Sequence, residues 1–496
     1  MSYPTTIGIT ATTGATVLFL DLLEVSELHR VHQVVRPATK DLANPVIRTG
    51  PLGAWDSLQA CPWQGTVMWD ADDDIYKAWY MGLDVAESGQ QMPRVGYAIS
   101  PDGRTWEKPA LNIFNYNNTL NNNLVALLPS IKTNGPALKD PGDDDPARQY
   151  KLLLFDENMD REIWNSPDGL HFAREGKPSI VSPRQPDGSR LRLPDPNVWF
   201  DAHQLLFDTQ DPNPDRRYKA YGQMSSERDG WHIRKGGLLY GPDPWTWTRS
   251  EYNPIIDPDD GDEFQIHFIS VLPYKGLYIM LYEFGWLEQS VYMADIRLAV
   301  SRDGEIFKRV QPNQPLVRRG SPGDWDGGFL VTSSDMVVRN DVIEIFYAGQ
   351  PTHWTNWPAE NRGDWPASAG SVYPSQTGLA TLPLDGFAGL ETVDGEMPGS
   401  VTTVPIQPSD ASVALALSWA NAMVERSWVE VHVLGMTGEP ISGWPTARVV
   451  SDGPHARPIW GENLILPLDQ QFRLRFILHG KARLFGFSFV PASDPQ

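Results

Sequence analysis

Residues 67–70 (VMWD), followed by 76–80 (YKAWY) and 100–103 (SPDG), form the stretch of sequence that decides the fold. An apolar segment ends at an acidic or Gly-rich turn, an aromatic strand around a Tyr follows, and a Ser-x-Asp-Gly turn closes the unit. The same order of features recurs, with closing turns at residues 166–169, 301–304 and 384–386, and the third unit departs with 241–244 (GPDP), so its turn must differ. Sheets this small cannot bury both faces alone, so we expect the units to stack around an axis. The sequence therefore predicts an all-β protein built on a five-bladed β-propeller.

The closing turns carry two further structural signals. An Asp-Gly pair supplies the positive φ values that a tight hairpin turn requires. An aromatic residue follows three positions after the Gly, at Trp106, Phe172 and Phe307. We expect these aromatic side chains to pack between neighbouring blades.

The two ends of the chain differ from the repeated part. From about residue 405, short runs such as 428–433 (WVEVHV) alternate apolar with other residues, which is typical of β-sandwich strands. We predict three parts: residues 1–44 as a segment that helps to close the propeller, 45–390 as the propeller, and 405–496 as the sandwich. Within the first part, the run 17–23 (VLFLDLL) or the strand 31–35 is expected to complete a blade, because pairing removes an open sheet edge.

Composition limits the partners and the compartment. The net charge of −21 disfavours nucleic acid and anionic membranes as partners. The single Cys61 allows neither an internal disulfide nor a thiolate zinc site. We see no basic leader at the N-terminus and no apolar run of about 18 residues. The expected location is the cytoplasm, or outside the cell if a leader was removed, and homo-oligomerisation stays open.

Polar residues that precede the apolar part of each first strand are candidates for a shared site. In a propeller these first strands line the axis, so their leading residues project into one end of the funnel. The positions hold Trp55, Asp56 and Trp63 in the first unit, Asp195, Asp201 and His203 in the third, Glu263, Gln265 and His267 in the fourth, and Asp324, Trp325 and Asp326 in the fifth. Carboxylates mixed with Trp and His suit glycoside cleavage, which needs one protonated acid and one ionised carboxylate.

Residues 199–208 (WFDAHQLLFD) resemble a segment of the propeller hydrolases of glycoside hydrolase families 32, 43, 62 and 68. In those families an Asp at this place opens the first strand of a blade and stabilises the transition state. The Ser-x-Asp-Gly-x-x-aromatic units resemble the families' blade motif, and a propeller followed by a sandwich is similar to the layout of family 32. The family 32 Trp-Met-Asn-Asp-Pro-Asn-Gly signature and its Glu-Cys pair are absent, so the chain is interpreted as a divergent relative.

The resemblance implies catalytic roles for Asp56, Asp201 and Glu263. Substrate contacts are expected from Trp55, Trp63, His203, His267, Asp324, Asp326 and His353. In the fourth unit His267 lies nearer than Glu263 to the families' acid position, so the identity of the acid stays open. Retention and inversion also stay open, and no metal or other cofactor is predicted.

The leading functional hypothesis is a glycoside hydrolase or transglycosylase acting on a terminal sugar, with a furanoside among the candidates. A carbohydrate lyase or a metal-assisted enzyme is an alternative that would use the axial His residues with Arg234 or Arg297. A sugar-binding propeller without catalysis is another. Glu283 lies in an aromatic strand and is expected to be a partner between blades, although a buried carboxylate in a pocket wall would be notable. Phosphate-loop, dinucleotide and zinc-protease motifs are absent from the sequence.

Overall fold

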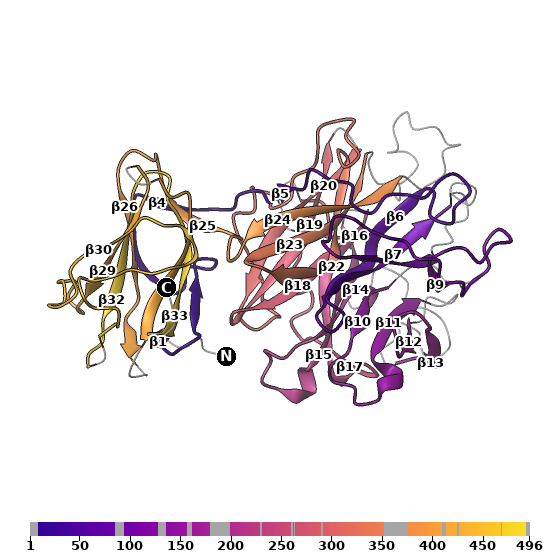
Figure 1. The fold of residues 1–496 in the computed structure, drawn as a ribbon, viewed down its shortest axis with the longest axis horizontal. Coiled ribbons are helices and arrows are strands. Elements are labelled where there is room, and N and C mark those ends of the chain that lie inside the picture. The colour runs from indigo at the N-terminus through magenta and orange to yellow at the C-terminus, as the bar shows by residue number, and fades with distance from the viewer. Residues whose placement is uncertain are drawn as a thin grey trace.

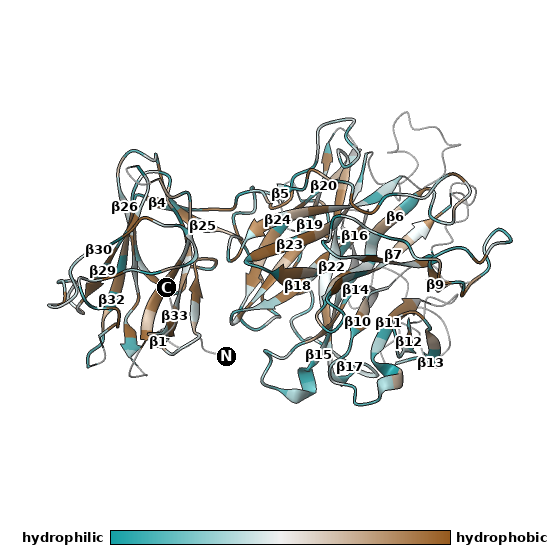
Figure 2. Cartoon of the chain, viewed as in Figure 1, coloured by the Kyte–Doolittle hydropathy of each residue, from teal (hydrophilic) through white to brown (hydrophobic). Residues whose placement is uncertain are grey.

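The computed structural model describes residues 8–84, 94–126, 135–155, 161–178, 199–228, 231–258, 261, 263–288, 291–351, 374–408, 413–423, 426–467 and 469–492. The described chain is almost entirely β-structure, and it forms a larger and a smaller body (Figure 1). Apolar residues run along the strands of both bodies, whereas many connecting loops are hydrophilic (Figure 2). The predicted combination of an all-β propeller with a β-sandwich is confirmed. No helix in the described ranges is long and apolar enough to cross a membrane.

The larger body consists of antiparallel groups of four strands, which we number blades 1 to 5. Short parallel pairings also join blade 4 to blade 5 and blade 5 to blade 1. Blade 1 contains β6 (Gln59–Asp70), β7 (Ile75–Leu83), β8 (Arg94–Ser100) and β9 (Leu124–Ala126), and blade 2 contains β10 (Ala137–Lys139), β11 (Tyr150–Phe155), β12 (Arg161–Ser166) and β13 (Ala173–Gly176). Blade 3 contains β14 (Trp199–Phe207), β15 (Tyr218–Arg228), β16 (Trp231–Asp243) and β17 (Thr246–Arg249), and blade 4 contains β18 (Ile269–Tyr274), β19 (Leu277–Glu288), β20 (Val291–Ser301) and β21 (Lys308–Arg309). Blade 5 contains β22 (Phe329–Arg339), β23 (Val342–Gln350), β24 (Ser375–Pro383) and, from the N-terminal part of the chain, β5 (Thr39–Lys40).

The strand that completes blade 5 is therefore β5, which pairs antiparallel with β24 through Lys40 and Ala380. The two segments chosen from the sequence for this task lie elsewhere. In the smaller body, β2 (Thr16–Leu18) pairs with β33 (Arg483–Pro491), and β4 (Val31–Val34) pairs with β25 (Gly389–Thr392). The assignment of the run 17–23 or the strand 31–35 to ring closure is thus corrected. Val17 and Phe19 pack in the sandwich core, whereas Leu18, Leu20 and Val35 pack against residues of blades 4 and 5. The short β5 supplies the missing edge.

The smaller body has two sheets facing one core. One sheet has the order β31 (Gly453–Ala456), β28 (Val413–Ala420), β33, β25 and β4, with β2 beside β33, and the other has β3 (Val25–His29), β26 (Gly399–Thr403), β32 (Arg473–Leu478), β29 (Val429–Leu434) and β30 (Ala447–Val449). A short parallel pair joins β1 (Ile9–Ala11) to β27 (Ile406–Pro408). The core between the sheets includes Trp419, Trp460, Phe476 and Phe487. The sandwich therefore starts at β25, earlier than residue 405, and it includes the N-terminal strands.

A buried polar group joins each of the first blades to the next. The Asp that ends a first strand accepts a hydrogen bond from the Tyr hydroxyl of the following blade, in the pairs Tyr150–Asp70, Tyr218–Asp140 and Tyr278–Asp208, each at 2.8 Å. The Lys that follows the blade's own Tyr forms an ion pair with the same Asp, as Lys77–Asp70, Lys151–Asp140 and Lys219–Asp208. We call each Asp, Lys and Tyr set a latch. It explains why Tyr-Lys follows every acidic turn in these units.

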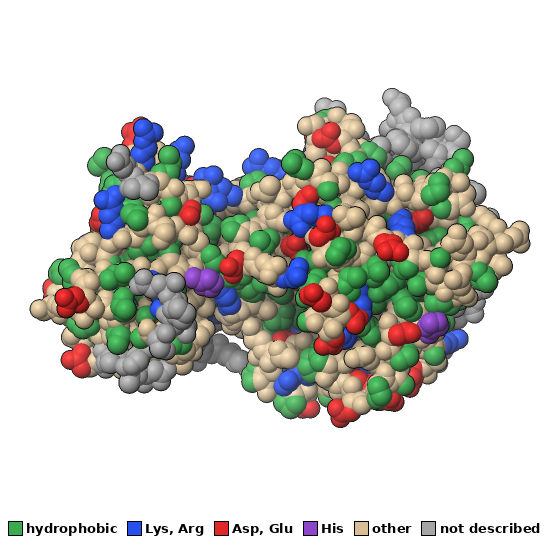
Figure 3. Space-filling view, viewed as in Figure 1, with side chains coloured by type: hydrophobic (Ala, Val, Ile, Leu, Met, Phe, Trp, Pro, Cys, Tyr) green, Lys and Arg blue, Asp and Glu red, His purple; other side chains and the backbone are tan. Residues whose placement is uncertain are grey.

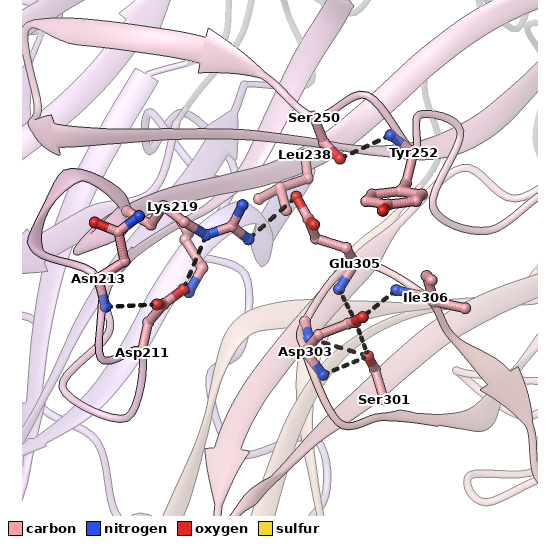
Figure 4. A network of polar contacts seen from close by, with 12 residues as sticks. Asp211, Asn213, Lys219, Leu238, Ser250, Tyr252, Ser301, Asp303, Glu305 and Ile306 are labelled. Atoms are coloured by element: carbon pink, nitrogen blue, oxygen red, sulfur yellow. Dashed lines mark hydrogen bonds and ion pairs between the residues drawn. The ribbon is translucent and has the colours of Figure 1, made fainter. Parts of the chain in front are cut away.

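The closing turns also connect neighbouring blades. Gly304 has a φ of +75°, and its carbonyl accepts the Tyr221 hydroxyl of blade 3 at 3.1 Å. Arg216 of blade 3 links Asp211 to Glu305 of blade 4, with both distances 3.1 Å. Figure 4 shows Asp211 on one side of this seam and Asp303 and Glu305 on the other. The Ser-x-Asp-Gly turn therefore serves the contact between blades as well as the hairpin.

The predicted position of the turn aromatics is confirmed. The ring of Trp106 lies 6.0 Å from Phe346 of blade 5, and Phe307 lies 6.5 Å from Tyr221 of blade 3. Phe172 packs against the cluster that contains Trp79 of blade 1. These rings fill the space between sheets that would otherwise expose apolar faces.

The last two seams use different residues for the same purpose. Between blades 4 and 5 the Tyr274 hydroxyl donates to Asp385 at 2.6 Å, and Lys275 pairs with the same carboxylate at 2.7 Å. Between blades 5 and 1 the Tyr76 hydroxyl donates to Glu344 at 2.5 Å. Every seam of the ring therefore contains a Tyr hydroxyl bonded to a carboxylate.

Removal of one latch hydroxyl should destabilise the ring. We expect Tyr278→Phe to lower the free energy of unfolding by about 1–3 kcal/mol, because it leaves the buried Asp208 carboxylate short of one donor. Urea denaturation measures this change. Tyr252→Phe is the matched control, since that Tyr side chain is 40% exposed, and its effect should stay within about 0.5 kcal/mol. Equal effects of the two substitutions would contradict the role of the latch.

Candidate functional site

Side-chain hydrogen bonds tie the first strands of the five blades together at the axis. The Ser334 hydroxyl of blade 5 lies 2.8 Å from Gly65 O of blade 1 and 2.5 Å from His203 O of blade 3, and its one proton can be donated to either carbonyl. Gln204 of blade 3 donates to Val271 O of blade 4 at 2.8 Å. Thr66 of blade 1 donates to Ala137 O of blade 2 at 3.0 Å. These contacts give the axis two mouths, one at the N-terminal ends of the first strands and one at their C-terminal ends.

Rings from several blades meet at the N-terminal mouth. Trp63 stacks on Phe268 with the ring centroids 5.6 Å apart, and Phe268 stacks on His203 at 4.6 Å. The His203 and His267 rings are 6.3 Å apart, and Phe329 of blade 5 lies 6.2 Å from Trp63. Trp63, His203 and His267, which the sequence predicts as substrate contacts, are therefore brought together. We call the set Trp63, His203, His267, Phe268, Glu283 and Tyr292 the axial cluster.

Glu283 is the carboxyl group of this cluster. It lies on β19, its side chain is 0% exposed, and the Tyr292 hydroxyl donates to its Oε1. Its Oε2 lies 3.9 Å from Nδ1 of His267. A Cβ on Gly285 would lie 1.7 Å from the Tyr292 hydroxyl, so only a glycine there allows Tyr292 to reach Glu283.

Burial determines the protonation of Glu283. Burial raises the pKa of its carboxyl to about 8, against the opposing effects of the Tyr292 hydrogen bond, the Arg234 charge and nearby backbone N–H groups. A carboxyl group with that pKa is mostly neutral at pH 7 and can donate its proton. The axial mouth thus holds a protonated acid at neutral pH.

His203 is neutral for the same reason. Burial, together with the positive charges of Arg234 and Arg161, lowers the pKa of its imidazole to about 3. Its Nδ1 accepts a long hydrogen bond of 3.4 Å from the backbone N–H of Ile269, which places the ring proton on Nε2. That Nε2 is buried and has no hydrogen-bond partner within the described ranges. The group is a buried donor without an acceptor.

Two buried amides add to the unsatisfied polar groups. Gln223 of blade 3 is 0% exposed, and neither atom of its amide has a hydrogen-bond partner in the part of the chain that the structure describes. Gln350 of blade 5 has a buried Oε1 in the same condition. Gln350 lies opposite Phe329 in the β22–β23 ladder, and Gln223 lies opposite Asp201 in the β14–β15 ladder. Because buried polar groups are costly when unpaired, such positions indicate a bound ligand or ordered water.

Asp56 and Trp55 lie at the seam between blades 5 and 1. The Asp56 carboxylate accepts the Tyr80 hydroxyl at 2.8 Å and pairs with Lys108 at 2.5 Å. Trp55 stacks on Tyr80 with the ring centroids 5.5 Å apart. Asp56 is therefore a buried carboxylate whose charge is paired with Lys108. Its described contacts include no member of the axial cluster. Its catalytic role stays a prediction.

Asp326 and Trp325 repeat this arrangement at the seam between blades 4 and 5. The Asp326 carboxylate accepts the Tyr347 hydroxyl at 2.9 Å and pairs with Lys40 at 2.5 Å. Trp325 stacks on Tyr347 at 5.8 Å. Both loops have the form Gly-x-x-Gly-x-Trp-Asp, at residues 50–56 and 320–326. The two Trp-Asp pairs that the sequence predicts as parts of the site therefore also pack in the same way at two seams.

The other predicted residues have separate positions. Glu263 is buried and pairs with Arg309 at 2.6 Å. Asp324 is exposed and accepts the Ser321 backbone N–H at 2.7 Å. Asp201 belongs to β14, but its side chain lies outside what the structure describes, and His353 lies outside the described residues altogether. Their predicted roles stay predictions.

Sequence reasoning expected Glu283 to be a partner between blades, with a buried carboxylate in a pocket wall as the alternative, and it did not select Gln223 or Gln350. The sequence does contain a signal for Glu283, because it is the only charged residue in residues 277–287 (LYIMLYEFGWL). A charged side chain is seldom fully buried unless it is paired. The described residues contain no group of three or more His, Cys, Asp or Glu side chains arranged to hold a metal ion. Acidic and basic side chains are both scattered over the visible surface of the two bodies (Figure 3).

Comparisons with known proteins find structural likeness only. No protein-family model matches the chain, and no curated protein sequence matches it. A solved glycoside hydrolase of the family 130 of mannoside phosphorylases, which targets β-1,2 mannosidic linkages in Candida mannan, has a TM-score of 0.45 at 15% identity, over 71% of this chain and 94% of that chain. A putative glycoside hydrolase from Parabacteroides distasonis has a TM-score of 0.45 at 12% identity, over 70% and 97%.

A fructofuranosidase from Schwanniomyces occidentalis, solved with fructosylnystose, has a TM-score of 0.41 at 10% identity, over 92% of this chain and 100% of that chain. The chain is therefore similar to solved glycoside hydrolases. At these identities the likeness concerns the fold alone.

The raised pKa of Glu283 has a consequence for stability. The folded carboxyl holds its proton to about pH 8, whereas the ordinary value is 4.5, so folding takes up a proton between these two pH values. The Glu283 contribution is then fully present below about pH 4.5 and is lost as the pH rises towards 8, by about 1.4 kcal/mol per pH unit.

We expect Glu283→Gln to remove this dependence. The free energy of unfolding of the variant minus that of the wild type should rise by a few kcal/mol, roughly 2–4, between pH 5 and pH 8.5. Urea denaturation at several pH values measures the difference. Glu288→Gln, an exposed position on the same strand, is the control and should give a difference independent of pH. A flat difference for Glu283→Gln would contradict the raised pKa.

Proposed function

We propose that this chain cleaves a glycosidic bond at the N-terminal axial mouth, with Glu283 as the proton donor. The observation that carries the proposal is a fully buried carboxyl group whose pKa is raised to about 8, held by Tyr292 beside aromatic rings and unsatisfied polar groups. Glycosidases need an acid that is still protonated at the working pH, and burial is the usual means of keeping one.

The second carboxylate of the reaction is assigned to Asp201. Its backbone lies opposite Gln223 in the β14–β15 ladder and two positions before His203. Proton transfer from Glu283 to the leaving oxygen accompanies cleavage of the bond between that oxygen and the anomeric carbon. The Asp201 carboxylate then either bonds to the anomeric carbon, followed by hydrolysis, or takes a proton from the attacking water. A carboxyl separation of about 5–5.5 Å belongs to the first route and about 6.5–9.5 Å to the second.

The other groups at the mouth suit a neutral sugar. The Nε2–H of His203 can donate to a hydroxyl, and the amide of Gln223 can both donate and accept. The Gln350 Oε1 can accept from a further hydroxyl. The rings of Trp63 and Phe268 offer apolar surface to the sugar ring. A terminal sugar fits a mouth at the end of an axis, and a furanoside stays among the candidates beside a pyranoside.

One observation favours a second candidate, which is phosphorolysis. The positive charges of Arg161 and Arg234 both act on the buried His203, so the mouth carries cationic groups from blades 2 and 3. Inorganic phosphate could be held there and could replace water as the attacking group. Cleavage would then depend on added phosphate and would release a sugar phosphate.

The experiment is a screen of aryl glycosides and oligosaccharides with and without phosphate. On a substrate so found, we expect Glu283→Gln and Asp201→Asn each to lower kcat by at least about 100-fold, because each removes a charge or proton that the transition state uses. Substrate binding, measured by calorimetry on the variants, should persist. The wild-type rate should fall as the pH rises above about 8, when the Glu283 carboxyl with its pKa of about 8 ionises.

Glu288→Gln is the control and should keep the wild-type rate. Full activity of Glu283→Gln would end the assignment of the acid. If the chain binds a sugar saturably but turns over no glycoside in the screen, it is a sugar-binding propeller and not an enzyme.

A further inference from the structure

The axis has a second mouth, at the C-terminal ends of the first strands, and it contains a cavity. The cavity has a volume of about 570 Å³, and blades 1, 2 and 5 line it. Its walls include Met68, Trp69, Leu138, Val337 and Val338. Along β22, Asp335 at this cavity is separated from Phe329 at the other mouth by roughly 20 Å of extended strand. The inner end of the cavity nevertheless adjoins the axial cluster, because Gln204, the residue after His203, donates to Asp335 at 3.1 Å.

Most carboxylates of this cavity already have a cation. The acidic residues among its lining are Asp70, Asp72, Asp140 and Asp335, and the only basic one in its described lining is Lys139. The ion pairs are Lys77–Asp70 at 2.7 Å, Lys139–Asp72 at 2.6 Å and Lys151–Asp140 at 2.9 Å. Three of the four carboxylates are therefore compensated within the fold.

Asp335 differs from these three. Gln204 Nε2 donates a hydrogen bond to Oδ1 of Asp335 at 3.1 Å. Among the described residues, no Lys or Arg forms an ion pair with Asp335. Burial raises the pKa of the Asp335 carboxyl to about 7, and the Gln204 hydrogen bond opposes this. Asp335 is half-buried at the cavity, and a partly desolvated carboxylate without a counter-ion is costly, so a cation that arrives with a ligand would stabilise it.

We propose that this cavity binds an organic ammonium ion with an apolar body, and that Asp335 is its counter-ion. The volume falls in the range of about 300–1,000 Å³ that is typical of small-molecule sites. The Val, Met and Leu walls suit a hydrocarbon body. A hard metal cation asks for about six oxygen ligands, and three of the four carboxylates in the lining are already paired with Lys side chains. Anions are disfavoured by the excess of carboxylates in the lining.

Protonation of the charged groups around the cavity sets the pH dependence of binding. Asp70, Asp72 and Asp140 face the cavity from blades 1 and 2 with their Lys partners. Asp335 is the remaining group, and its carboxyl ionises near neutral pH. Binding of an ammonium ion should therefore be stronger at pH 8 than at pH 6.

The test uses phenethylamine, which is cationic at pH 8, and its neutral analogue 2-phenylethanol. In calorimetric titrations of the full chain at pH 8, we expect saturable binding of phenethylamine that Asp335→Asn weakens at least tenfold. Binding of 2-phenylethanol should be weak and equal in the two proteins. Asp72→Asn, whose side chain is 79% exposed, is the matched control and should bind phenethylamine like the wild type.

A second variant tests the cavity without changing the charge of Asp335. Val338→Trp at the rim should block the cavity and abolish phenethylamine binding while Asp335 is intact. Glycoside turnover at the opposite mouth should be unchanged in Val338→Trp, since Val338 lies at the outer end of β22. Absence of saturable binding to the wild type, or equal binding by the wild type and Asp335→Asn, would overturn the proposal.

Discussion

The structure depends on the buried latch in which the Asp at the end of a first strand meets its own Lys and the Tyr of the next blade. Burying a carboxylate is costly unless it is paired and hydrogen-bonded. The Asp208 latch supplies both, through Lys219 and Tyr278. Because the Tyr comes from the neighbouring blade, a carboxylate is fully satisfied only when the blades stand side by side. Packing order thus follows from local chemistry.

The latches have a consequence for the axis. They hold the first strands with all their N-terminal ends at one mouth, where rings and polar groups of blades 1, 3, 4 and 5 are buried. In that buried environment Glu283 keeps its proton and His203 stays neutral, since burial dominates the pKa shift of both groups. Among the described residues, the amide of Gln223 has no hydrogen-bond partner. The polar groups that the fold does not satisfy are the ones that a substrate could satisfy.

Much of the fold could be predicted from the sequence, because the Tyr strands and Asp-Gly turns repeat along the chain. Ring closure could not, since β5 has two residues and no apolar pattern. The functional site was harder to predict than the fold. Asp56 and Asp326 look like exposed acids beside a Trp, and the Lys108 and Lys40 that neutralise them are remote in sequence. In the sequence Glu283 looks like an ordinary strand residue. Its raised pKa comes from burial, and that burial exists only when the blades have assembled.

The most direct test of the account is the protonation of Glu283 in the intact protein. Carboxyl ¹³C NMR of a sample labelled at Glu, with the Glu283 signal assigned by its loss in Glu283→Gln, gives the titration of this group alone. We expect a midpoint pKa near the value of about 8. A Glu283 carboxyl that titrates near its ordinary value of 4.5 would contradict a buried acid held ready to donate a proton at the axial mouth.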